Sequence, residues 1–449
     1  MAERQRIVSG MRPTGPLHLG HYFGVLVNWL KLQEEYDCFF FVADWHALTS
    51  EYANPRKVTT FVPELVKDWV AAGLDPAKCV IFQQSAVKNH AELHLLLSMT
   101  TPVGLLERCP TYKDMKEQLT TKDLTTYGFL GYPVLMSTDI LMYLAEAVPV
   151  GEDQLPHMEL CREIAGRFNW MYGDFFPEPQ ALLTKESKLP GLDGRKMSKS
   201  YGNGIYLRDT MDDVRPKVMG MLTDANRKRR EDPGDPKVCN LFPYHELMTD
   251  PARLDAIRSG CRDASWGCVD CKKLLLESME TFLAPIQARR RELDNDPAML
   301  KAILEAGNAK AIKASDATMD RVRHILATSP GKSPELYVDM VADVLADMGA
   351  DMGLEYVAEP GGDGPDFTIR HGGREILVEC KNSEKKLSVK ILEDVIARYE
   401  KLGKPWLLVT GTPLNSKAQK RLGQLDGTVD IVYGVTPEQV KEGLQKALA

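Results

Sequence analysis

Two short segments carry histidines and lysines at spacings that suit the binding of a polyphosphate. The first is His18-Leu19-Gly20-His21, which lies where a short apolar strand turns into a helical pattern. A helix N-terminus has free N–H groups and a partial positive charge, so it favours a polyphosphate. His18 and His21 can donate to phosphate oxygens, and Gly20 allows a ligand to approach closely. Taken alone, two histidines near the start of a helix are more often structural.

The second segment is the loop Gly194-Arg195-Lys196-Met197-Ser198-Lys199-Ser200. Its two lysines can neutralise charge as pyrophosphate leaves, and stabilising developing charge is usually the largest catalytic contribution. An ordinary surface loop is the alternative. However, His-x-Gly-His followed about 175 residues later by Lys-Met-Ser-Lys-Ser resembles the signature pair of class I aminoacyl-tRNA synthetases. This resemblance implies that His18, His21, Lys196 and Lys199 are catalytic.

The elements that must position these segments alternate between strands and helices. Apolar runs predict strands over residues 7–10, 38–42 and 79–83, with helices over about 19–36 and up to about 72. This alternation indicates a parallel sheet with right-handed crossovers. Ligands bind beyond the carboxyl ends of the strands in such sheets. We therefore expect an α/β fold, with a Rossmann-type catalytic domain over residues 1–209.

Two further motifs make the resemblance more specific. Residues 131–141 (GYPVLMSTDIL) and 148–154 (VPVGEDQ) resemble the tryptophan-binding helix and the following loop of tryptophanyl-tRNA synthetases, and the likeness extends from residue 1 to about 325. It implies an amino-acid pocket lined by Val8, His46, Tyr132, Met136, Asp139, Val148, Val150 and Gln154. It implies an ATP site made of Arg12, Thr14, Gly20, His21, Gly151, Glu152, Asp153, Lys196, Met197, Ser198, Lys199 and Ser200.

Asp139 interrupts an apolar helix, where a carboxylate is costly unless it has a partner. The indole of tryptophan is a pure N–H donor, so one acceptor deep in an apolar slot would recognise it. If the site is dry, the same unpaired acceptor would penalise phenylalanine by ~10⁴-fold. The alternative is an aspartate on the helix surface that faces water.

The resemblance implies a reaction that needs no protein nucleophile. The tryptophan carboxylate attacks the α-phosphate of ATP in line, so that catalysis consists of positioning and charge stabilisation. ATP carries Mg²⁺, and the adenylate then transfers its aminoacyl group to tRNA(Trp), with release of AMP and pyrophosphate. The family is usually a homodimer. The competing hypothesis is a non-charging paralogue that binds or cleaves RNA through its C-terminal part.

Residues 210–327 show helical, charged patterns and predict a helical anticodon-binding domain. Within it, Cys239, Cys261, Cys268 and Cys271 end in a Cys-x2-Cys pair that suits a metal ion or an iron–sulfur cluster. Zinc sites usually show two such close pairs, so zinc and free thiols remain alternatives. Some tryptophanyl-tRNA synthetases hold a [4Fe–4S] cluster in a similar array near the anticodon-binding region, and the resemblance implies the same cluster here.

A linker over residues 328–334 precedes a separate domain predicted over 335–449, with strands over 354–357, 366–369, 375–379, 406–410 and 429–432. Pro365-Asp366 on one strand and Glu379-Cys380-Lys381 on the next resemble the restriction-endonuclease-like superfamily. Asp366 and Glu379 could then bind one Mg²⁺, with Lys381 beside the attacked phosphate. Cleavage of nucleic acid and binding alone both stay open.

The composition limits the class of protein further. The chain has 449 residues, of which 44% are apolar and 27% charged, as in globular proteins of several domains. A net charge of −7 argues against indiscriminate coating of nucleic acid, although Arg227–Arg230 and Arg289–Arg291 are candidate RNA-binding faces. No apolar run is long enough to span a bilayer, and we see no signal peptide. Nine cysteines do not suggest a secreted disulfide framework, so we expect a cytoplasmic protein.

Overall fold

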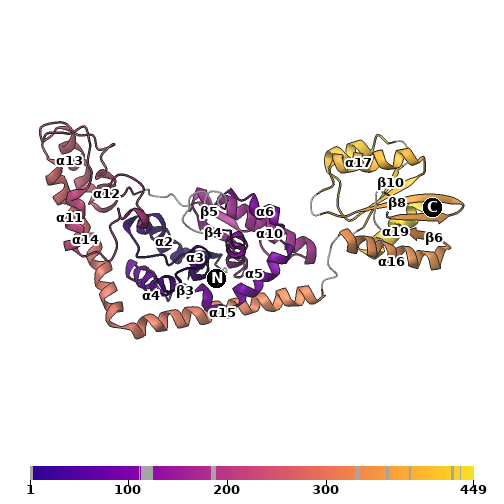
Figure 1. Ribbon diagram of the computed structural model, residues 1–449, viewed down its shortest axis with the longest axis horizontal. Helices are drawn as coiled ribbons and strands as arrows, with labels where there is room; N and C mark the ends of the chain where they lie inside the picture. The colour runs from indigo at the N-terminus through magenta and orange to yellow at the C-terminus, as the bar shows by residue number, and fades with distance from the viewer. Residues whose placement is uncertain are drawn as a thin grey trace. The chain divides into compact units, whose positions relative to one another are not determined.

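The computed structural model describes residues 4–110, 112, 125–183, 189–328, 334–359, 364–383, 386–425, 429–434 and 436–448 (Figure 1). Most of the predicted linker, residues 329–333, lies outside the described residues. The chain divides into two compact units. The first comprises Met1–Gly166 with Phe176–His324, and the second comprises Arg167–Phe175 with Ile325–Ala449.

The first unit is built on a five-stranded parallel sheet. Its strand order is β3(Cys79–Gln83), β2(Asp37–Val42), β1(Arg6–Met11), β4(Ala147–Val150) and β5(Gln180–Leu183). All neighbouring strands run parallel. The chain winds from β1 to β3 on one side and continues with β4 on the other. The carboxyl ends of β1 and β4 therefore flank the point where the winding reverses, which is where such sheets bind ligands.

The three predicted strands of this sheet are confirmed, but β4 and β5 were not predicted. Val148 and Val150, which we expected in a loop, lie on strand β4. Four residues that include a proline are too few to give a clear strand periodicity, so the sequence of β4 resembles that of a loop.

The helix predicted over residues 19–36 is confirmed, but one of its turns is wider. α1(Leu19–His21) continues through a π-helical turn, η1(Tyr22–Leu26), into α2(Val27–Glu35). Aromatic rings join this helix to the sheet. Trp29 stacks on Phe40 of β2 with ring centroids 4.3 Å apart, and it meets Trp69 edge-on at 5.2 Å. Such wide turns are often found at functional sites.

The helices around the carboxyl ends of β1 and β4 frame the site. Helix α9(Tyr132–Leu141) is buried around nearly its whole circumference, which explains why its sequence is apolar on every side. The framing helices are α3(Asp44–Glu51), α4(Pro55–Ala72), η2(Gln84–Ala86), α5(Asn89–Thr100), α6(Val103–Glu107), α8(Tyr127–Leu130), α9(Tyr132–Leu141), η3(Glu152–Gln154) and α10(Leu155–Tyr172).

Residues 210–327 form helices without a strand, as predicted. Arg290, at the centre of one candidate RNA-binding run, is buried and paired with Asp68 and Glu64 of α4. It therefore joins two helices and is not available to RNA. The helices are α11(Met211–Gly220), α12(Phe242–Met248), α13(Pro251–Arg262), α14(Cys268–Asn295) and α15(Pro297–Thr328).

Helix α15 runs along the first unit and lies against β3, the outermost strand of its sheet (Figure 1). A Cβ atom at Gly307 would lie only 1.8 Å from the Ile81 carbonyl oxygen, so the helix approaches the strand more closely than any side chain allows. The Asn308 side chain accepts a hydrogen bond of 2.9 Å from the Gln83 backbone N–H.

The second unit has α16(Pro334–Met352) and a mixed sheet ordered β10(Val429–Tyr433), β9(Trp406–Thr410), β8(Arg374–Lys381), β7(Phe367–His371) and β6(Glu355–Ala358). Strands β6 to β8 are antiparallel, and β8 to β10 are parallel. All five strands lie where we predicted them. Gly372 and Gly373 both have positive φ, +57° and +75°, which the tight β7–β8 turn requires.

Helices cover both faces of this second sheet. Alternate side chains of β8 point to opposite faces. Val378 joins a core with α16 and α19(Pro437–Leu448), whereas Leu377 joins a core with α17(Val389–Tyr399) and α18(Ser416–Leu422). Glu379, two residues after Leu377, consequently faces α17.

Candidate active site

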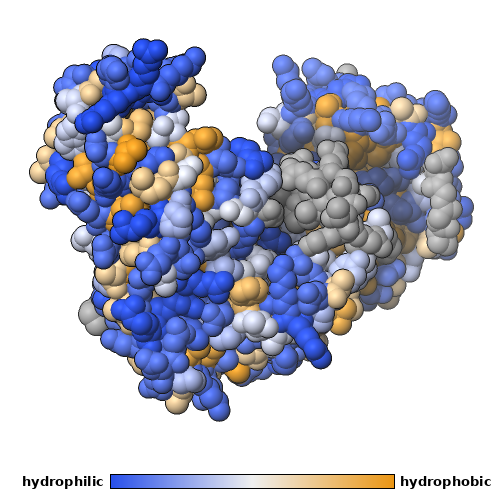
Figure 2. Space-filling view, turned by 60° about the vertical axis from the view of Figure 1, so that its left-hand side comes forward, coloured by the Kyte–Doolittle hydropathy of each residue, from blue (hydrophilic) through white to orange (hydrophobic). Residues whose placement is uncertain are grey.

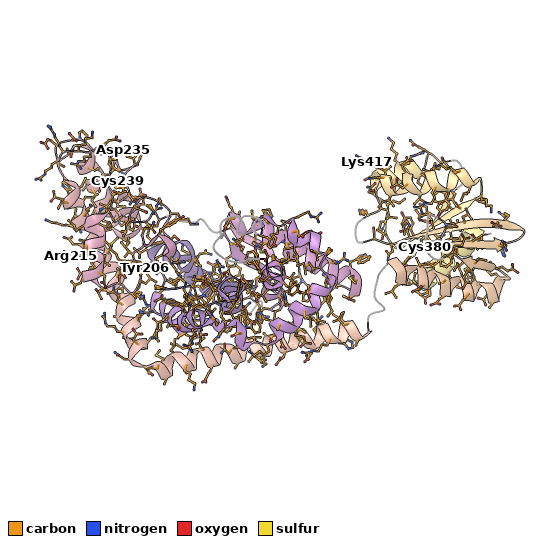
Figure 3. The ribbon with its side chains drawn as sticks, viewed as in Figure 1. Tyr206, Arg215, Asp235, Cys239, Cys380 and Lys417 are labelled. Carbon is orange, nitrogen blue, oxygen red and sulfur yellow. The ribbon has the colours of Figure 1, made fainter. Side chains whose placement is uncertain are left out.

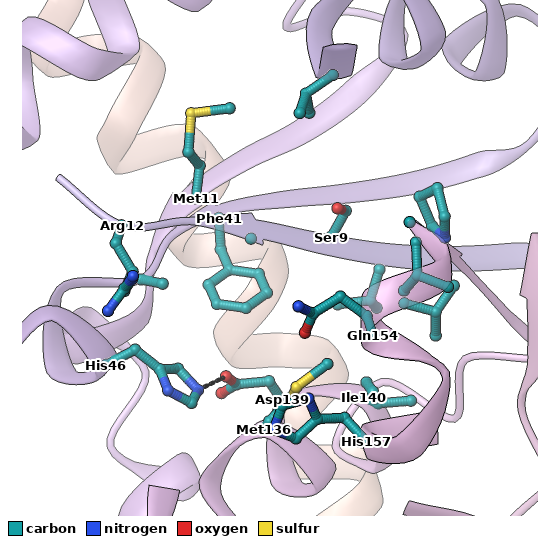
Figure 4. Close-up of a pocket in the computed structure, with 18 of the residues that line it drawn as sticks. Ser9, Met11, Arg12, Phe41, His46, Met136, Asp139, Ile140, Gln154 and His157 are labelled. Carbon is teal, nitrogen blue, oxygen red and sulfur yellow. Dashed lines mark hydrogen bonds and ion pairs between the residues drawn. The ribbon is translucent and has the colours of Figure 1, made fainter. Parts of the chain in front are cut away.

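A cavity of about 440 Å³ opens at the carboxyl ends of β1 and β4 (Figure 4). Strands β1 and β4 and helix α9 give it mainly apolar walls, and polar side chains enter from α3, η3 and α10. The eight residues predicted for an amino-acid pocket all line this cavity: Val8, His46, Tyr132, Met136, Asp139, Val148, Val150 and Gln154.

Asp139 does not present the unpaired acceptor that we expected. Its carboxylate is 2% exposed and accepts hydrogen bonds from His46 Nε2 at 2.8 Å, His90 Nδ1 at 2.6 Å and Gln84 Nε2 at 2.7 Å. Burial alone would raise the pKa of Asp139, but the hydrogen bonds from His46 and His90 outweigh it and lower the pKa to about 2. The carboxylate is therefore ionised. Sequence reasoning missed Gln84 and His90.

Sequence reasoning also missed a histidine at the η3 end of the cavity. His157 of α10 lines the cavity, and its Nε2 lies 3.0 Å from the Tyr132 hydroxyl. Burial, reinforced by the nearby His46, lowers the pKa of His157 to about 4, so its ring is neutral. Its Nδ1 is buried and has no hydrogen-bond partner among the described residues. Gln154 donates to the Asp153 carboxylate at 2.7 Å.

The two predicted polyphosphate segments lie against each other, although they are far apart in the sequence. Lys199 Nζ donates to the Gly15 carbonyl oxygen at 2.8 Å. Gly15 has a φ of +148°, which favours glycine. A Cβ atom at Gly20 would lie 3.0 Å from His18 Nδ1 and 3.6 Å from Met197 Cβ. A side chain at Gly20 would therefore crowd the His18 ring, whereas its distance from the lysine loop would be an ordinary contact distance.

Burial keeps both histidines of the first segment neutral. It lowers the pKa of His18 to about 4 and that of His21 to about 2, and the nearby charge of Lys199 adds to both shifts. His21 Nδ1 accepts the His18 backbone N–H at 3.3 Å, so the ring proton of His21 is on Nε2. Burial likewise lowers the pKa of Lys199 to about 8, against the opposing charge of Asp68.

The residues predicted to bind ATP fall into two groups. Arg12, His21, Gly151 and Asp153 line the cavity itself. Thr14, Gly20, Glu152 and the loop residues Lys196, Met197, Ser198 and Lys199 lie outside its lining, with Glu152 and Lys196 exposed. The Ser200 side chain lies outside the described part of the structure.

The four cysteines predicted as ligands, Cys239, Cys261, Cys268 and Cys271, line one small second cavity. Cys271 Sγ lies 3.2 Å from His245 Nε2, and burial, with the neighbouring cysteines, raises the pKa of Cys271 to about 12. Metals and clusters bind thiolates rather than thiols. In the residues that the structure describes, no group of three or more His, Cys, Asp or Glu side chains is arranged to hold a metal ion. The structure therefore does not show the predicted iron–sulfur cluster, and it shows only that the four cysteines share one small cavity.

In the second unit, the three residues singled out by sequence lie together on β8 and just before β7. Asp366 accepts the Cys380 backbone N–H at 2.7 Å. Glu379 is 2% exposed, pairs with Lys381 at 2.5 Å and with Arg398 at 3.3 Å, and accepts from the Tyr399 hydroxyl. Burial, followed by the charge of Glu379, raises the pKa of Asp366. Figure 3 shows this part of the second unit around Cys380.

Comparisons with known proteins agree with the geometry of the first unit. A family model described as tRNA synthetases class I (W and Y) matches residues 1–284. The chain is 52% identical over 324 residues to a tryptophan–tRNA ligase of Thermotoga maritima and 45% identical over 388 residues to one of Aquifex aeolicus. These alignments cover 72% and 71% of this chain and 98% of each relative.

A solved structure of tryptophanyl-tRNA synthetase from Campylobacter jejuni, complexed with ADP and tryptophan, has a TM-score of 0.67 and 33% identity. It matches 72% of this chain and 100% of its own length. The fold, the site and these matches define a class I tRNA synthetase of the tryptophan and tyrosine group. Within that group, the chain belongs to the tryptophan–tRNA ligase family. None of the described helices is both long and apolar enough to cross a membrane.

Proposed function

We propose that the cavity binds tryptophan beside ATP, so that the chain forms tryptophanyl-adenylate and transfers the tryptophanyl group to tRNA(Trp). The observation that carries this proposal is the buried, ionised carboxylate of Asp139 in a cavity with mainly apolar walls, because it suits an aromatic side chain with one N–H donor. The histidine and lysine segments lie beside the same cavity, where the ATP phosphates must reach the amino acid.

Each part of the site has a role in this reaction. The tryptophan carboxylate attacks the α-phosphate, and its position relative to ATP supplies most of the catalysis. Neutral His21 donates its Nε2–H to a phosphate oxygen. Lys196 and Lys199 neutralise the charge of the departing pyrophosphate, and Tyr132 and Gln154 orient the ammonium group. A Mg²⁺ ion bound to ATP supplies further charge neutralisation.

The decisive experiment is tryptophan-dependent exchange of pyrophosphate into ATP. We expect exchange with tryptophan and none above background with tyrosine or phenylalanine. A folded preparation that shows no exchange with tryptophan would refute the proposal. Charging of tRNA(Trp) by the same preparation then tests the second step.

We further propose that residues 335–449 form a restriction-endonuclease-like domain, separate from a catalytic domain over 1–209 and a helical domain over 210–327. The support is an antiparallel hairpin followed by parallel strands, with Asp366 and Glu379 next to each other. Because Glu379 is already paired with Lys381, Arg398 and Tyr399, we favour binding of nucleic acid over cleavage.

A nuclease assay of the full chain with Mg²⁺ or Mn²⁺ tests this preference. We expect retention of DNA or RNA on a filter without cleavage, and weaker retention in Lys381→Ala. Cleavage that is abolished in Glu379→Ala, with an unchanged melting temperature, would reverse the preference. Glu375→Ala is the matched control, because it removes a half-buried carboxylate on the same strand that pairs with Lys404.

A [4Fe–4S] cluster at Cys239, Cys261, Cys268 and Cys271 remains a proposal that rests on the spacing of the cysteines and their common cavity. Protein purified without oxygen should be brown and hold about four irons per chain, as one cubane requires. Colourless protein with one zinc, or with no metal, would refute the cluster.

We also propose a cytoplasmic homodimer. Three apolar side chains at the end of α5 and the start of α6, Leu95, Met99 and Val103, are 53%, 70% and 56% exposed and suit burial against a second copy. Figure 2 shows that apolar side chains also reach the surface elsewhere. Sedimentation should give twice the chain mass for the wild type, and Met99→Lys should shift it to the monomer.

A further inference from the structure

The three donors around Asp139 differ in how firmly they are held. Gln84 Oε1 accepts the backbone N–H groups of Trp45 and His46 at 3.1 and 3.3 Å, so its NH₂ group must point toward Asp139. Gln84 Nε2 lies 2.7 and 2.9 Å from the two carboxylate oxygens. Its amide is thus fixed from both ends.

His90 is fixed in the same way. It is fully buried, with Nδ1 2.6 Å from Asp139 Oδ1 and Nε2 2.8 Å from the Tyr143 hydroxyl. An ionised carboxylate only accepts, so Nδ1 carries a ring proton, and a neutral ring then accepts the hydroxyl proton of the buried Tyr143 at Nε2. The chain Tyr143–His90–Asp139 therefore has one consistent direction of donation.

Together, these contacts give each carboxylate oxygen of Asp139 two hydrogen bonds. Oδ1 accepts from His90 and Gln84, and Oδ2 accepts from His46 and Gln84. A carboxylate offers about four lone-pair directions, so a new donor has to replace an existing one. Of the three donors, only His46 lines the cavity, and its side chain is 13% exposed (Figure 4).

We propose that tryptophan is recognised by exchange: the indole N–H takes the place of His46 Nε2–H on Asp139 Oδ2, while Gln84 and His90 hold the carboxylate in place. His46 is then a displaceable donor, which satisfies the buried carboxylate until the substrate arrives. Gln84 and His90 are positioning residues, and Tyr143 sets the direction of the His90 hydrogen bonds. The inference rests on the proposed tryptophan site and adds which contact the substrate breaks.

A test of this donor exchange must separate two effects: contacts with the ring of the substrate, and the hydrogen bond from its N–H group to Asp139. Contacts of His46 with the ring of the substrate are shared by tryptophan and by β-(3-benzothienyl)alanine, in which sulfur replaces the indole N–H. The ratio of kcat/KM for these two amino acids, in ATP–pyrophosphate exchange by the full chain, reports only the hydrogen bond to Asp139.

His90→Leu and Gln84→Leu should each lower this ratio by about tenfold or more, because a hydrogen bond to a mispositioned carboxylate loses most of its strength. His90→Asn keeps an N–H donor near the position of Nδ1, so it should hold the ratio within about threefold of the wild type. His46→Ala should keep or raise the ratio, even where it lowers kcat/KM for both amino acids.

Different results of these measurements would refute different parts of the proposal. If His46→Ala lowers the ratio as strongly as His90→Leu, His46 stays on Asp139 and the exchange is refuted. If His90→Leu and Gln84→Leu both leave the ratio unchanged, or if His90→Asn lowers it as strongly as His90→Leu, the two residues do not position the carboxylate as proposed. If the wild type shows no exchange with tryptophan at all, the proposed function itself fails, independently of this inference.

Discussion

Asp139 shows how a charged side chain that binds substrate can be held in the apolar wall of a cavity. Taking a carboxylate out of water is costly unless donors replace the lost hydration. Here a glutamine and two histidines from three other elements do so, and they keep the group ionised at neutral pH. The same donors must lose their partner if the carboxylate is removed.

We therefore predict that Asp139→Ala affects both binding and stability. KM for tryptophan should rise about 100-fold or more, and discrimination against phenylalanine should fall. The buried donors left unpaired should lower the free energy of unfolding by roughly 2–4 kcal/mol. Exchange kinetics and urea unfolding measure the two effects. KM for ATP is the internal control, and a change there as large as that for tryptophan would show that the pocket assignment is wrong.

Lys199 should show a trade-off between stability and rate. Its pKa is about 8 in the folded chain, mainly because of burial, and 10.5 is the ordinary value. The unfolded state thus binds more protons between pH 8 and 10.5, and stability from this group rises with pH over that window. Lys199→Met should stabilise the protein at pH 7 by roughly 1 kcal/mol and slow adenylate formation by about 100-fold. Thermal unfolding at pH 7 and pH 10 should show the gain shrinking with pH. A gain that grows with pH would contradict the burial of this charge.

Sequence motifs identified the residues that touch a ligand better than the residues that support them. The eight pocket residues could be predicted because they belong to recognisable motifs, and all of them line one cavity. Gln84, His90 and His157 stood in segments without such a motif, and their importance depends on contacts with α3 and α9. A buried histidine reads like any core residue until its neighbours are known.

At the scale of elements, long periodic segments were predictable and short ones were not. The strands of the second unit and the helices after residue 210 appeared as predicted. β4 and β5 have four residues each, and β4 contains Pro149, so neither gave a strand signal. The π-helical turn at Tyr22–Leu26 has no sequence signature that we could use.

The contact between α15 and β3 gives a prediction at this scale. Gly307→Ala would place a methyl group inside the contact distance of the Ile81 carbonyl oxygen, so the helix must move. We expect a loss of roughly 2–4 kcal/mol in the free energy of unfolding. Gly166→Ala in α10 is the control, because no heavy atom lies within 4 Å of its added Cβ. The control should be neutral or stabilising by about 0.5–1 kcal/mol. Equal effects of the two exchanges would mean that the close approach is not as described.

At the scale of the whole molecule, the curated relatives match most of this chain but not all of it. The alignments reach 98% of two curated relatives with 72% and 71% of this chain. We predict that removal of residues 335–449 leaves kcat/KM for tryptophan activation within about twofold. The full chain carrying Glu379→Ala is the matched control for effects of the tail site alone. Collapse of activation on truncation would show that the tail belongs to the synthetase core.

The position of α15 also affects how readily the partly unfolded protein aggregates. The free side of an outermost strand presents N–H and C=O groups that can pair with a strand of another molecule. The apolar β3 sequence, Cys-Val-Ile-Phe-Gln, is well suited to such intermolecular pairing. Gly307 allows the helix to approach this side of β3 closely, and the Asn308 side chain accepts the hydrogen bond of the Gln83 N–H. Partial proteolysis within α15, or gentle heating that releases it, should consequently produce β-rich aggregates that bind thioflavin before the sheet itself unfolds.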